Sequence, residues 1–110
     1  MGLSEEICEP CRTEGPTLAQ EEQELLLEEL GNDWEIIEAH HLRKSYSFKD
    51  FVSALDFTNK IGALAEEVGH HPNIFLTWGE VALDIWTHKR DGLTRADFIL
   101  AAKSDHRYQG

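Results

Sequence analysis

The sequence predicts an α+β domain, in which a four-stranded antiparallel sheet carries three helices on one face in the order αββαββα. Strand-like runs occur in two pairs, at residues 34–48 and 73–88, and each pair has a short internal connection. A long helical pattern at about residues 48–68 separates the two pairs. Strands joined by short connections pair antiparallel, and helices gathered on one face of such a sheet close a single core.

The first helix is expected to begin at Thr17 and to end at Gly31. Thr17-x-x-Gln20 has the form of a capping box, and glycine is the residue best suited to a helix stop. Residues 1–16 show no sustained periodicity and are predicted to be an irregular arm, so that residues 17–110 form the single domain. The apolar stripe of this helix consists of Leu18, Leu25, Leu26 and Leu30.

The first strand pair is predicted at residues 34–39 and 41–48, and it is followed directly by the long helix. His40 and His41 fall near the connection between these strands. A histidine in a turn is usually exposed, so we interpret this pair as surface residues without a role in a site.

The long helix at residues 48–68 is expected to begin at the capping signature Ser47-x-x-Asp50 and to end at Gly69. Its apolar residues fall on two nearly opposite sides, and a helix apolar on both sides needs two partners. One partner is the sheet, and the other is a neighbouring helix or a second subunit. The two sides are formed by Phe48, Phe51, Val52 and Leu55, and by Phe57, Ile61, Leu64 and Val68.

The second strand pair, residues 73–78 and 81–88, is predicted to be a hairpin whose two-residue loop is Gly79-Glu80. In that register, opposed positions have numbers that sum to 159. The predicted opposed pairs are Trp78 with Val81, Asn73 with Trp86, and His71 with His88.

This register gathers three histidines, His70, His71 and His88, at one end of the sheet. Glu66 reaches them from the last turn of the preceding helix, since it lies four positions before His70. Directly opposed residues hold their Cβ atoms roughly 5 Å apart. The arrangement depends on the register, because a slip of one residue turns alternate side chains to the other face.

The last helix is predicted to begin at the capping signature Thr94-x-x-Asp97 and to carry Phe98, Ile99 and Leu100. The cap already explains Asp97, and a role for it in a site stays open.

The charge balance argues against several classes of partner. Ten basic and 21 acidic residues give a net charge of −11, which disfavours nucleic acid and anionic membranes. No apolar run approaches the roughly 20 residues that span a bilayer. The first residues, MGLSEEIC, lack the basic and apolar segments of a secretory signal. We therefore expect a cytoplasmic protein.

Cys8 and Cys11 form a C-x-x-C in the N-terminal arm. Two thiolates alone do not complete a structural zinc site, and a redox pair would follow a strand and open a helix. We interpret them as an exposed pair without a catalytic role, with metal capture shared with a second chain or a histidine as the alternative.

The histidine cluster with its carboxylate allows three interpretations. Neighbouring imidazoles can donate and accept protons at neutral pH, as acid–base catalysis requires. Three histidines and a glutamate could also bind zinc or iron, although Pro72 stiffens the chain beside those ligands. The third interpretation is a set of hydrogen-bonded surface residues.

The cluster belongs to a longer pattern, Glu66-x3-His70-His71-Pro72-x5-Trp78-x9-His88-x8-Asp97. This pattern resembles the signature of the pterin-4a-carbinolamine dehydratases, which are also called dimerisation cofactors. The resemblance covers roughly residues 17–105, including the order of the elements. Gly69 and Ile74 depart from animal members, which carry an aspartate and a tryptophan at these positions.

The resemblance implies a lyase that needs no cofactor and no metal, and that dehydrates 4a-hydroxytetrahydrobiopterin to quinonoid dihydrobiopterin. It implies that His70 is the leading general acid/base, and that His71 and His88 bind the pterin and share proton transfer. Glu66 then holds and tunes the histidine pair, and Asp97 matches the final acid of the signature. Pro72 and Trp78 complete the substrate surroundings.

Family members form homo-dimers or homo-tetramers, which agrees with the two-sided helix at residues 48–68. The alternative function is a non-catalytic dimerisation or assembly cofactor of the same fold. A pure scaffold has no physical need to keep the histidine trio, which favours the enzyme.

Overall fold

The computed structural model describes residues 17–108. The predicted arm at residues 1–16, with Cys8 and Cys11, lies outside the described residues, as do residues 109–110. The elements in chain order are α1 (Gln20–Leu30), β1 (Glu35–Ile37), β2 (His41–Ser47), α2 (Phe51–Val68), β3 (Asn73–Thr77), β4 (Glu80–Ile85), the 3-10 helix η2 (His88–Arg90) and α3 (Arg95–Arg107).

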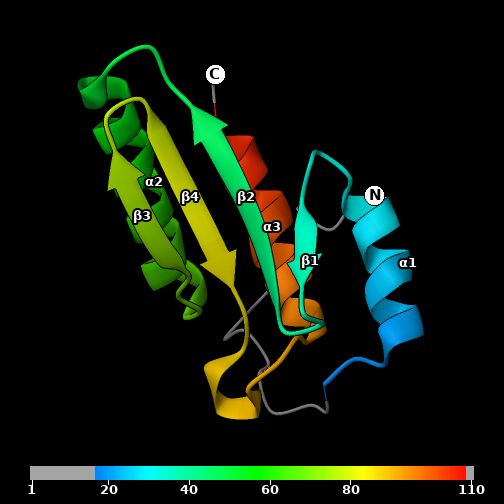
Figure 1. The fold of residues 1–110 in the computed structure, drawn as a ribbon. Helices are drawn as coiled ribbons and strands as arrows, with labels where there is room; N and C mark the ends of the chain where they lie inside the picture. The colour runs from blue at the N-terminus through cyan, green and yellow to red at the C-terminus, as the bar shows by residue number, and fades with distance from the viewer. Residues whose placement is uncertain (1–16, 109–110) are drawn as a thin grey trace.

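The four strands form one antiparallel sheet in the order β1-β2-β4-β3. Helices α2 and α3 lie against one face of this sheet, and α1 lies beside α3 near the β1 edge (Figure 1). The predicted fold class is therefore confirmed. Within residues 17–108, no helix is long and apolar enough to cross a membrane.

Alternate residues of the two central strands form the core. Leu42 and Tyr46 of β2 and Leu83 of β4 are fully buried against the helices. Of the two predicted sides of α2, only one is buried, and it consists of Phe57, Ile61, Leu64 and Val68. The other side remains exposed at Phe51, Val52 and Leu55.

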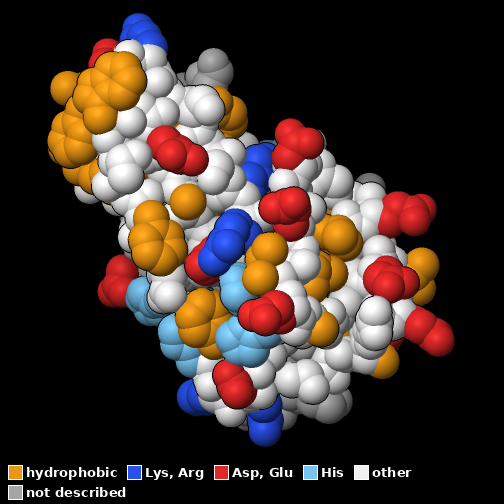
Figure 2. Space-filling model, in the orientation of Figure 1, with side chains coloured by type: hydrophobic (Ala, Val, Ile, Leu, Met, Phe, Trp, Pro, Cys, Tyr) orange, Lys and Arg blue, Asp and Glu red, His pale blue; other side chains and the backbone are white. Residues whose placement is uncertain are grey.

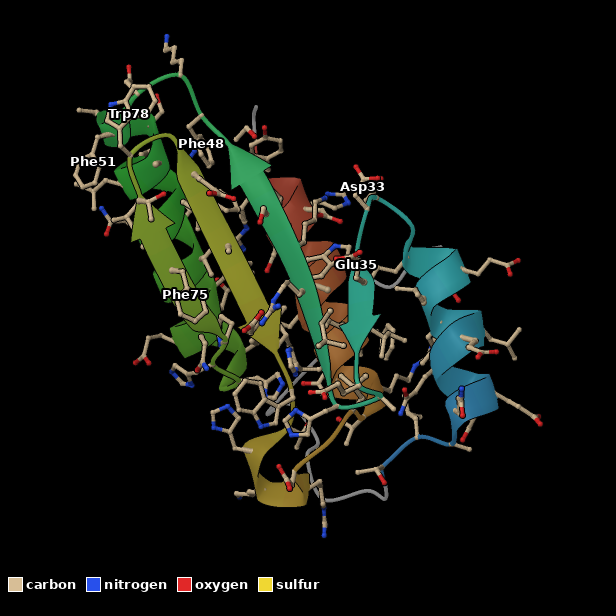
Figure 3. All side chains as sticks on the ribbon, viewed as in Figure 1. Asp33, Glu35, Phe48, Phe51, Phe75 and Trp78 are labelled. Carbon is tan, nitrogen blue, oxygen red and sulfur yellow. The ribbon has the colours of Figure 1, made fainter. Side chains whose placement is uncertain are left out.

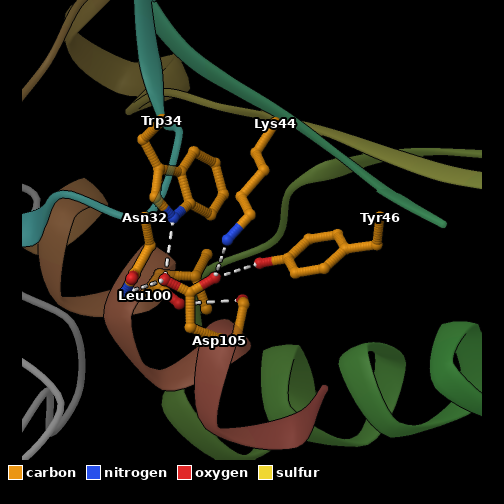
Figure 4. A network of polar contacts seen from close by, with 7 residues as sticks. Asn32, Trp34, Lys44, Tyr46, Leu100 and Asp105 are labelled. Carbon is orange, nitrogen blue, oxygen red and sulfur yellow. Dashed lines mark hydrogen bonds and ion pairs between the residues drawn. The ribbon is translucent and has the colours of Figure 1, made fainter. Parts of the chain in front are cut away.

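A largely buried carboxylate, 12% exposed, fixes α3 to the sheet (Figure 4). Asp105 of α3 accepts hydrogen bonds from the hydroxyl of Tyr46 at 2.5 Å and from the ammonium of Lys44 at 2.8 Å. Its second oxygen accepts from the indole of Trp34 at 3.0 Å and from the amide of Asn32 at 3.2 Å. Four donors therefore surround one charge, which satisfies it away from bulk water.

The predicted start of α1 is wrong. The helix begins at Gln20 rather than Thr17, and the backbone N–H of Ala19 donates to the carboxylate of Glu22 at 3.1 Å. A glutamate three positions inside the helix thus takes the role that the sequence assigned to Gln20. Leu25 belongs to the predicted apolar stripe, but it is 69% exposed. The stop at residue 31 is confirmed, with a positive φ of 58°.

The predicted start of α2 is also wrong by three residues. Ser47 ends β2, and the helix begins at Phe51 with Asp50 as its N-cap. The carboxylate of Asp50 accepts from the backbone N–H of Ser53 at 2.8 Å. An aspartate is as good an N-cap as a serine, and Ser47 is already paired with Glu80 in the sheet.

The predicted hairpin register is wrong by two residues. The turn is Trp78-Gly79 rather than Gly79-Glu80, because Thr77 pairs with Glu80. Gly79 supplies the positive φ of 73° that this turn requires. A Cβ there would also lie 3.3 Å from the carbonyl oxygen of Phe48.

The residue numbers of opposed positions in the hairpin therefore sum to 157, as in the pair Asn73 and Asp84. A shift of two residues keeps every side chain on its expected face. It nevertheless places residue 71 level with Trp86, and not with His88 as predicted.

Candidate active site

The His70 side chain is held by a carboxylate in the interior. Gly69 ends α2 in the left-handed conformation, with φ of 70°, and turns the chain so that His70 points inward. Nε2 of His70 lies 2.6 Å from Oδ1 of the fully buried Asp97. When Asp97 accepts the Nε2 proton, a neutral His70 carries its lone pair on Nδ1.

Asp97 also caps α3, as predicted. Its Oδ2 accepts from the backbone N–H of Thr94 and from the hydroxyl of Thr87, each at 2.8 Å. One carboxylate therefore caps a helix and orients an imidazole at the same time. The two interpretations of Asp97 that the sequence left open are compatible.

His71 pairs with a different carboxylate, at the surface. Its Nε2 lies 2.6 Å from Oε2 of Glu66, which comes from the last turn of α2. The sequence placed Glu66 within reach of His70, and the structure pairs it with His71 instead. The two side chains are 60% and 79% exposed, so this imidazole faces solvent while His70 does not.

His88 begins η2 and stacks on the indole of Trp86. The ring centroids are 4.3 Å apart and the planes are inclined by 24°. The predicted histidine trio thus lies at one end of the β3–β4 hairpin, with His70 and His71 before β3 and His88 after β4.

Two more histidines lie at this end of the sheet, so the interpretation of this turn pair as surface residues without a role in a site is not supported. The rings of His40 and His41 contact Trp86, at centroid distances of 5.2 Å and 5.7 Å. Figure 2 shows the histidine side chains gathered around hydrophobic atoms on one face of the molecule. The cause is the pairing of β2 with β4, in which Leu42 faces Ile85, so that His41 comes level with Trp86.

The remaining signature residues lie in different places. Pro72 directly precedes β3, next to His71. Trp78 sits in the β3–β4 turn at the opposite end of the hairpin and is 72% exposed. Figure 3 shows it beside Phe51, far from the strand ends that precede His88. Within one chain, Trp78 therefore does not line the same site as the histidines.

The chemistry of this end of the sheet is that of oriented imidazoles. Two of the three predicted histidines are hydrogen-bonded to carboxylates and the third is stacked on an indole. In the part of the chain that the structure describes, no three His, Cys, Asp or Glu side chains are grouped so that they could hold a metal ion. A carboxylate fixes the orientation of an imidazole and stabilises its protonated form, which suits proton transfer to and from a ligand.

Similar proteins occur in several bacteria. A protein of Rickettsia canadensis, provisionally named pterin-4-alpha-carbinolamine dehydratase, is 54% identical over 101 residues, which cover 92% of this chain and 93% of the relative. A protein of Rubrobacter xylanophilus with the same provisional name is 48% identical over 103 residues, or 94% of this chain and 95% of the relative.

Solved structures share the fold. The transcriptional coactivator/pterin dehydratase of Brucella melitensis superposes with a TM-score of 0.77 at 28% identity, covering 83% of this chain and 97% of that one. A pterin dehydratase-like protein, identified as a RuBisCO assembly factor in the alpha-carboxysome, has a TM-score of 0.63 at 24% identity, covering 74% and 95%.

The sequence profile of one family, described as pterin 4 alpha carbinolamine dehydratase, matches residues 16–107. The matched stretch contains every element of the fold and all of the histidines that surround Trp86. The chain belongs to the pterin 4 alpha carbinolamine dehydratase family.

Proposed function

We propose that this protein dehydrates 4a-hydroxytetrahydrobiopterin to quinonoid dihydrobiopterin and so takes part in tetrahydrobiopterin recycling. The observation that supports this most is the buried pair of His70 and Asp97, at 2.6 Å. Burying an imidazole together with a carboxylate costs desolvation free energy, and a scaffold that binds through its surface gains nothing from it. An acid–base catalyst gains a fixed orientation of the imidazole. We also propose a cytoplasmic location, as expected from the sequence.

The reaction breaks two bonds, C4a–O and N5–H, and moves two protons. The C4a–O bond breaks, and the hydroxyl leaves with an added proton as water. The N5–H bond loses its proton, and its electron pair forms the C4a=N5 double bond of the quinonoid product. No electrons enter or leave, so imidazoles alone can supply the acid and the base.

The three histidines take different shares of these steps. His70 is the leading general acid/base and assists loss of the 4a-hydroxyl, because its ring is the most firmly oriented. His71 and His88 bind the pterin and share the proton transfers. Glu66 and Asp97 hold the rings and balance the charge of the protonated imidazoles. A small heterocycle held between fixed rings also reacts faster because it is already oriented.

Kinetics with freshly generated 4a-hydroxytetrahydrobiopterin test the proposal. The substrate is made in the cuvette, and its dehydration is followed by absorbance with and without the purified protein. The proposal expects a rate that is proportional to protein concentration and well above the spontaneous rate. A rate equal to the spontaneous one, in a folded protein, contradicts it.

An exposed apolar surface supports a second candidate function, a partner-binding or assembly module. This surface lies where α2 begins and where the β3–β4 hairpin turns (Figures 2 and 3), and it consists of Phe51, Val52, Leu55 and Trp78. Large apolar side chains gathered on a surface usually mark a contact with another chain.

We assign this apolar surface to self-association as a homo-dimer or homo-tetramer, which is compatible with either function. Light scattering of the wild-type protein and of Val52→Glu tests the assignment, since Val52 is 74% exposed and the change leaves the core intact. The variant should have a lower mass than the wild type. Equal masses would contradict the assignment, and a self-associating protein without dehydratase activity would favour the module.

A further inference from the structure

Trp86 is the centre of an aromatic cluster that contains three imidazoles. His88 stacks on its indole, and His40 contacts the same side chain at a centroid distance of 5.2 Å with an inclination of 45°. His41 contacts it at 5.7 Å and 53°. His40 and His41 in turn meet edge to face at 5.3 Å. The indole of Trp86 therefore packs against the imidazoles of His40 and His41, and the imidazole of His88 stacks on it.

The two holding imidazoles are fixed by a chain of hydrogen bonds that begins at a carboxylate. Oδ1 of Asp91 lies 2.8 Å from Nε2 of His40, so a neutral His40 donates from Nε2 and keeps its lone pair on Nδ1. Nδ1 of His41 lies 3.1 Å from that atom and must donate to it. The lone pair of His41 is then on Nε2, which is buried and has no hydrogen-bond partner.

Only this arrangement of protons satisfies both hydrogen bonds with neutral rings. Burial also lowers the pKa of His41, which favours its neutral form. A second proton on His41 would place an N–H at the buried Nε2 atom, where nothing accepts it. Asp91, His40 and His41 therefore form a hydrogen-bonded backing, and the indole of Trp86 packs against its two imidazoles.

We propose that His40, His41 and Trp86 are positioning residues, which act by holding the imidazole of His88 in the orientation that the dehydration needs. This inference rests on the proposed function. His88 is exposed and begins a 3-10 helix of only three residues, so its own element gives its ring little support. Stacking on a fixed indole restricts the ring before substrate binds, which lowers the entropy cost of reaching the reactive geometry.

Kinetics of Trp86→Leu and Trp86→Phe test the positioning role. Trp86→Leu should lower kcat by about tenfold, because misplaced reacting groups lose up to about 10²-fold, while KM changes less than kcat. Trp86→Phe keeps a flat ring and should recover most of the rate. His106→Ala is the matched control, since His106 is exposed on α3 and lies outside the cluster.

A double variant separates positioning from a general loss of structure. In the background of His88→Ala, Trp86→Leu should change kcat by less than about twofold, because the ring that Trp86 holds is already gone. An equal loss in both backgrounds would overturn the proposal. So would an unchanged kcat in the single variant, or a rise in KM alone, which would make Trp86 a substrate contact.

Proton NMR of the His88 ring provides a readout that does not depend on activity. In the wild type, the indole ring current should shift these protons, and His40→Ala should move them toward the positions of an unstacked histidine. Unmoved His88 signals in His40→Ala would overturn the proposal. If the wild-type protein fails to dehydrate the pterin, the proposed function fails, while this spectrum still decides whether the backing holds His88.

Discussion

The imidazole of His70 and the carboxylate of Asp97 meet in the interior of the protein, with 2.6 Å between Nε2 and Oδ1, although they lie 27 positions apart in the chain. His70 follows the end of α2, and Asp97 lies in the first turn of α3. The contact therefore joins the ends of two helices, and the orientation of the imidazole depends on how those helices pack.

Replacing His70 by alanine should lower the dehydration rate by about 10²-fold or more, which is the usual scale for losing a positioned acid/base. Stopped-flow absorbance with freshly generated substrate measures the rate, and circular dichroism checks that the variant folds. His106→Ala should keep the wild-type rate. A folded His70→Ala protein with a nearly unchanged rate would remove His70 from its proposed role.

Replacing Asp97 by alanine should cost about 3 kcal/mol of the free energy of unfolding. The buried hydroxyl of Thr87, the N–H of Thr94 and the imidazole of His70 would each lose their acceptor. Urea denaturation measures this loss. Glu67→Ala is the control, because its 67% exposed carboxylate lies 3.8 Å from Arg107 and should contribute less than about 1 kcal/mol. Equal losses in the two variants would contradict the role given to Asp97.

The network around Asp105 predicts a graded pair of stability changes. Tyr46→Phe removes one of four donors and should cost about 1.5 kcal/mol, the usual contribution of a hydrogen bond to a charged group. Asp105→Ala leaves the mostly buried Lys44 ammonium without its partner and should cost about 3 kcal/mol or more. Denaturant unfolding of both variants should give this order, and the reverse order would contradict the network.

Acid should destabilise the protein partly through His41. Burial lowers the pKa of His41 below its ordinary value of 6.5, an effect that Asp84 and Glu38 oppose and that Arg43 and His40 reinforce. The unfolded chain therefore takes up this proton at a higher pH than the folded protein. The stability that comes from neutral His41 is present above about pH 6.5 and is lost as the pH falls below it.

Urea denaturation between about pH 7.5 and pH 5.5 measures this effect. The free energy of unfolding of His41→Gln should fall less over this range than that of the wild type. His106→Gln should behave as the wild type. Parallel curves for the wild type and His41→Gln would show that His41 does not contribute.

Local sequence signals predicted most of the fold, because helix caps, helix stops and apolar spacing depend on interactions between residues close together in the chain. The stop at Gly31, the cap at Thr94 and an apolar side of α2 that packs in the core follow from residue type and helical spacing alone, and all three are present, although spacing did not show which of the two apolar sides is buried. The predicted starts of α1 and α2 were wrong, because serine, threonine and aspartate are all good N-caps. Ser47 is also paired with Glu80 in the sheet and is therefore not the N-cap of α2.

The surroundings of the histidines could be predicted only in part. The trio was expected at one end of the hairpin, and it lies there even though the register differs by two residues. The contacts of His40 and His41 with Trp86 depend on the pairing of β2 with β4, which are separated by the whole of α2. No local pattern encodes such a pairing, and a turn histidine looks the same whether or not a partner strand brings an indole beside it.

A titration with a stable reduced pterin, followed by NMR of the histidine ring protons, tests the central claim most directly. If His70, His71 and His88 surround one pterin site, all three sets of signals should shift along a single saturation curve, while those of His106 stay in place. Signals of the three histidines that do not move, or that follow different curves, would contradict a shared pterin site.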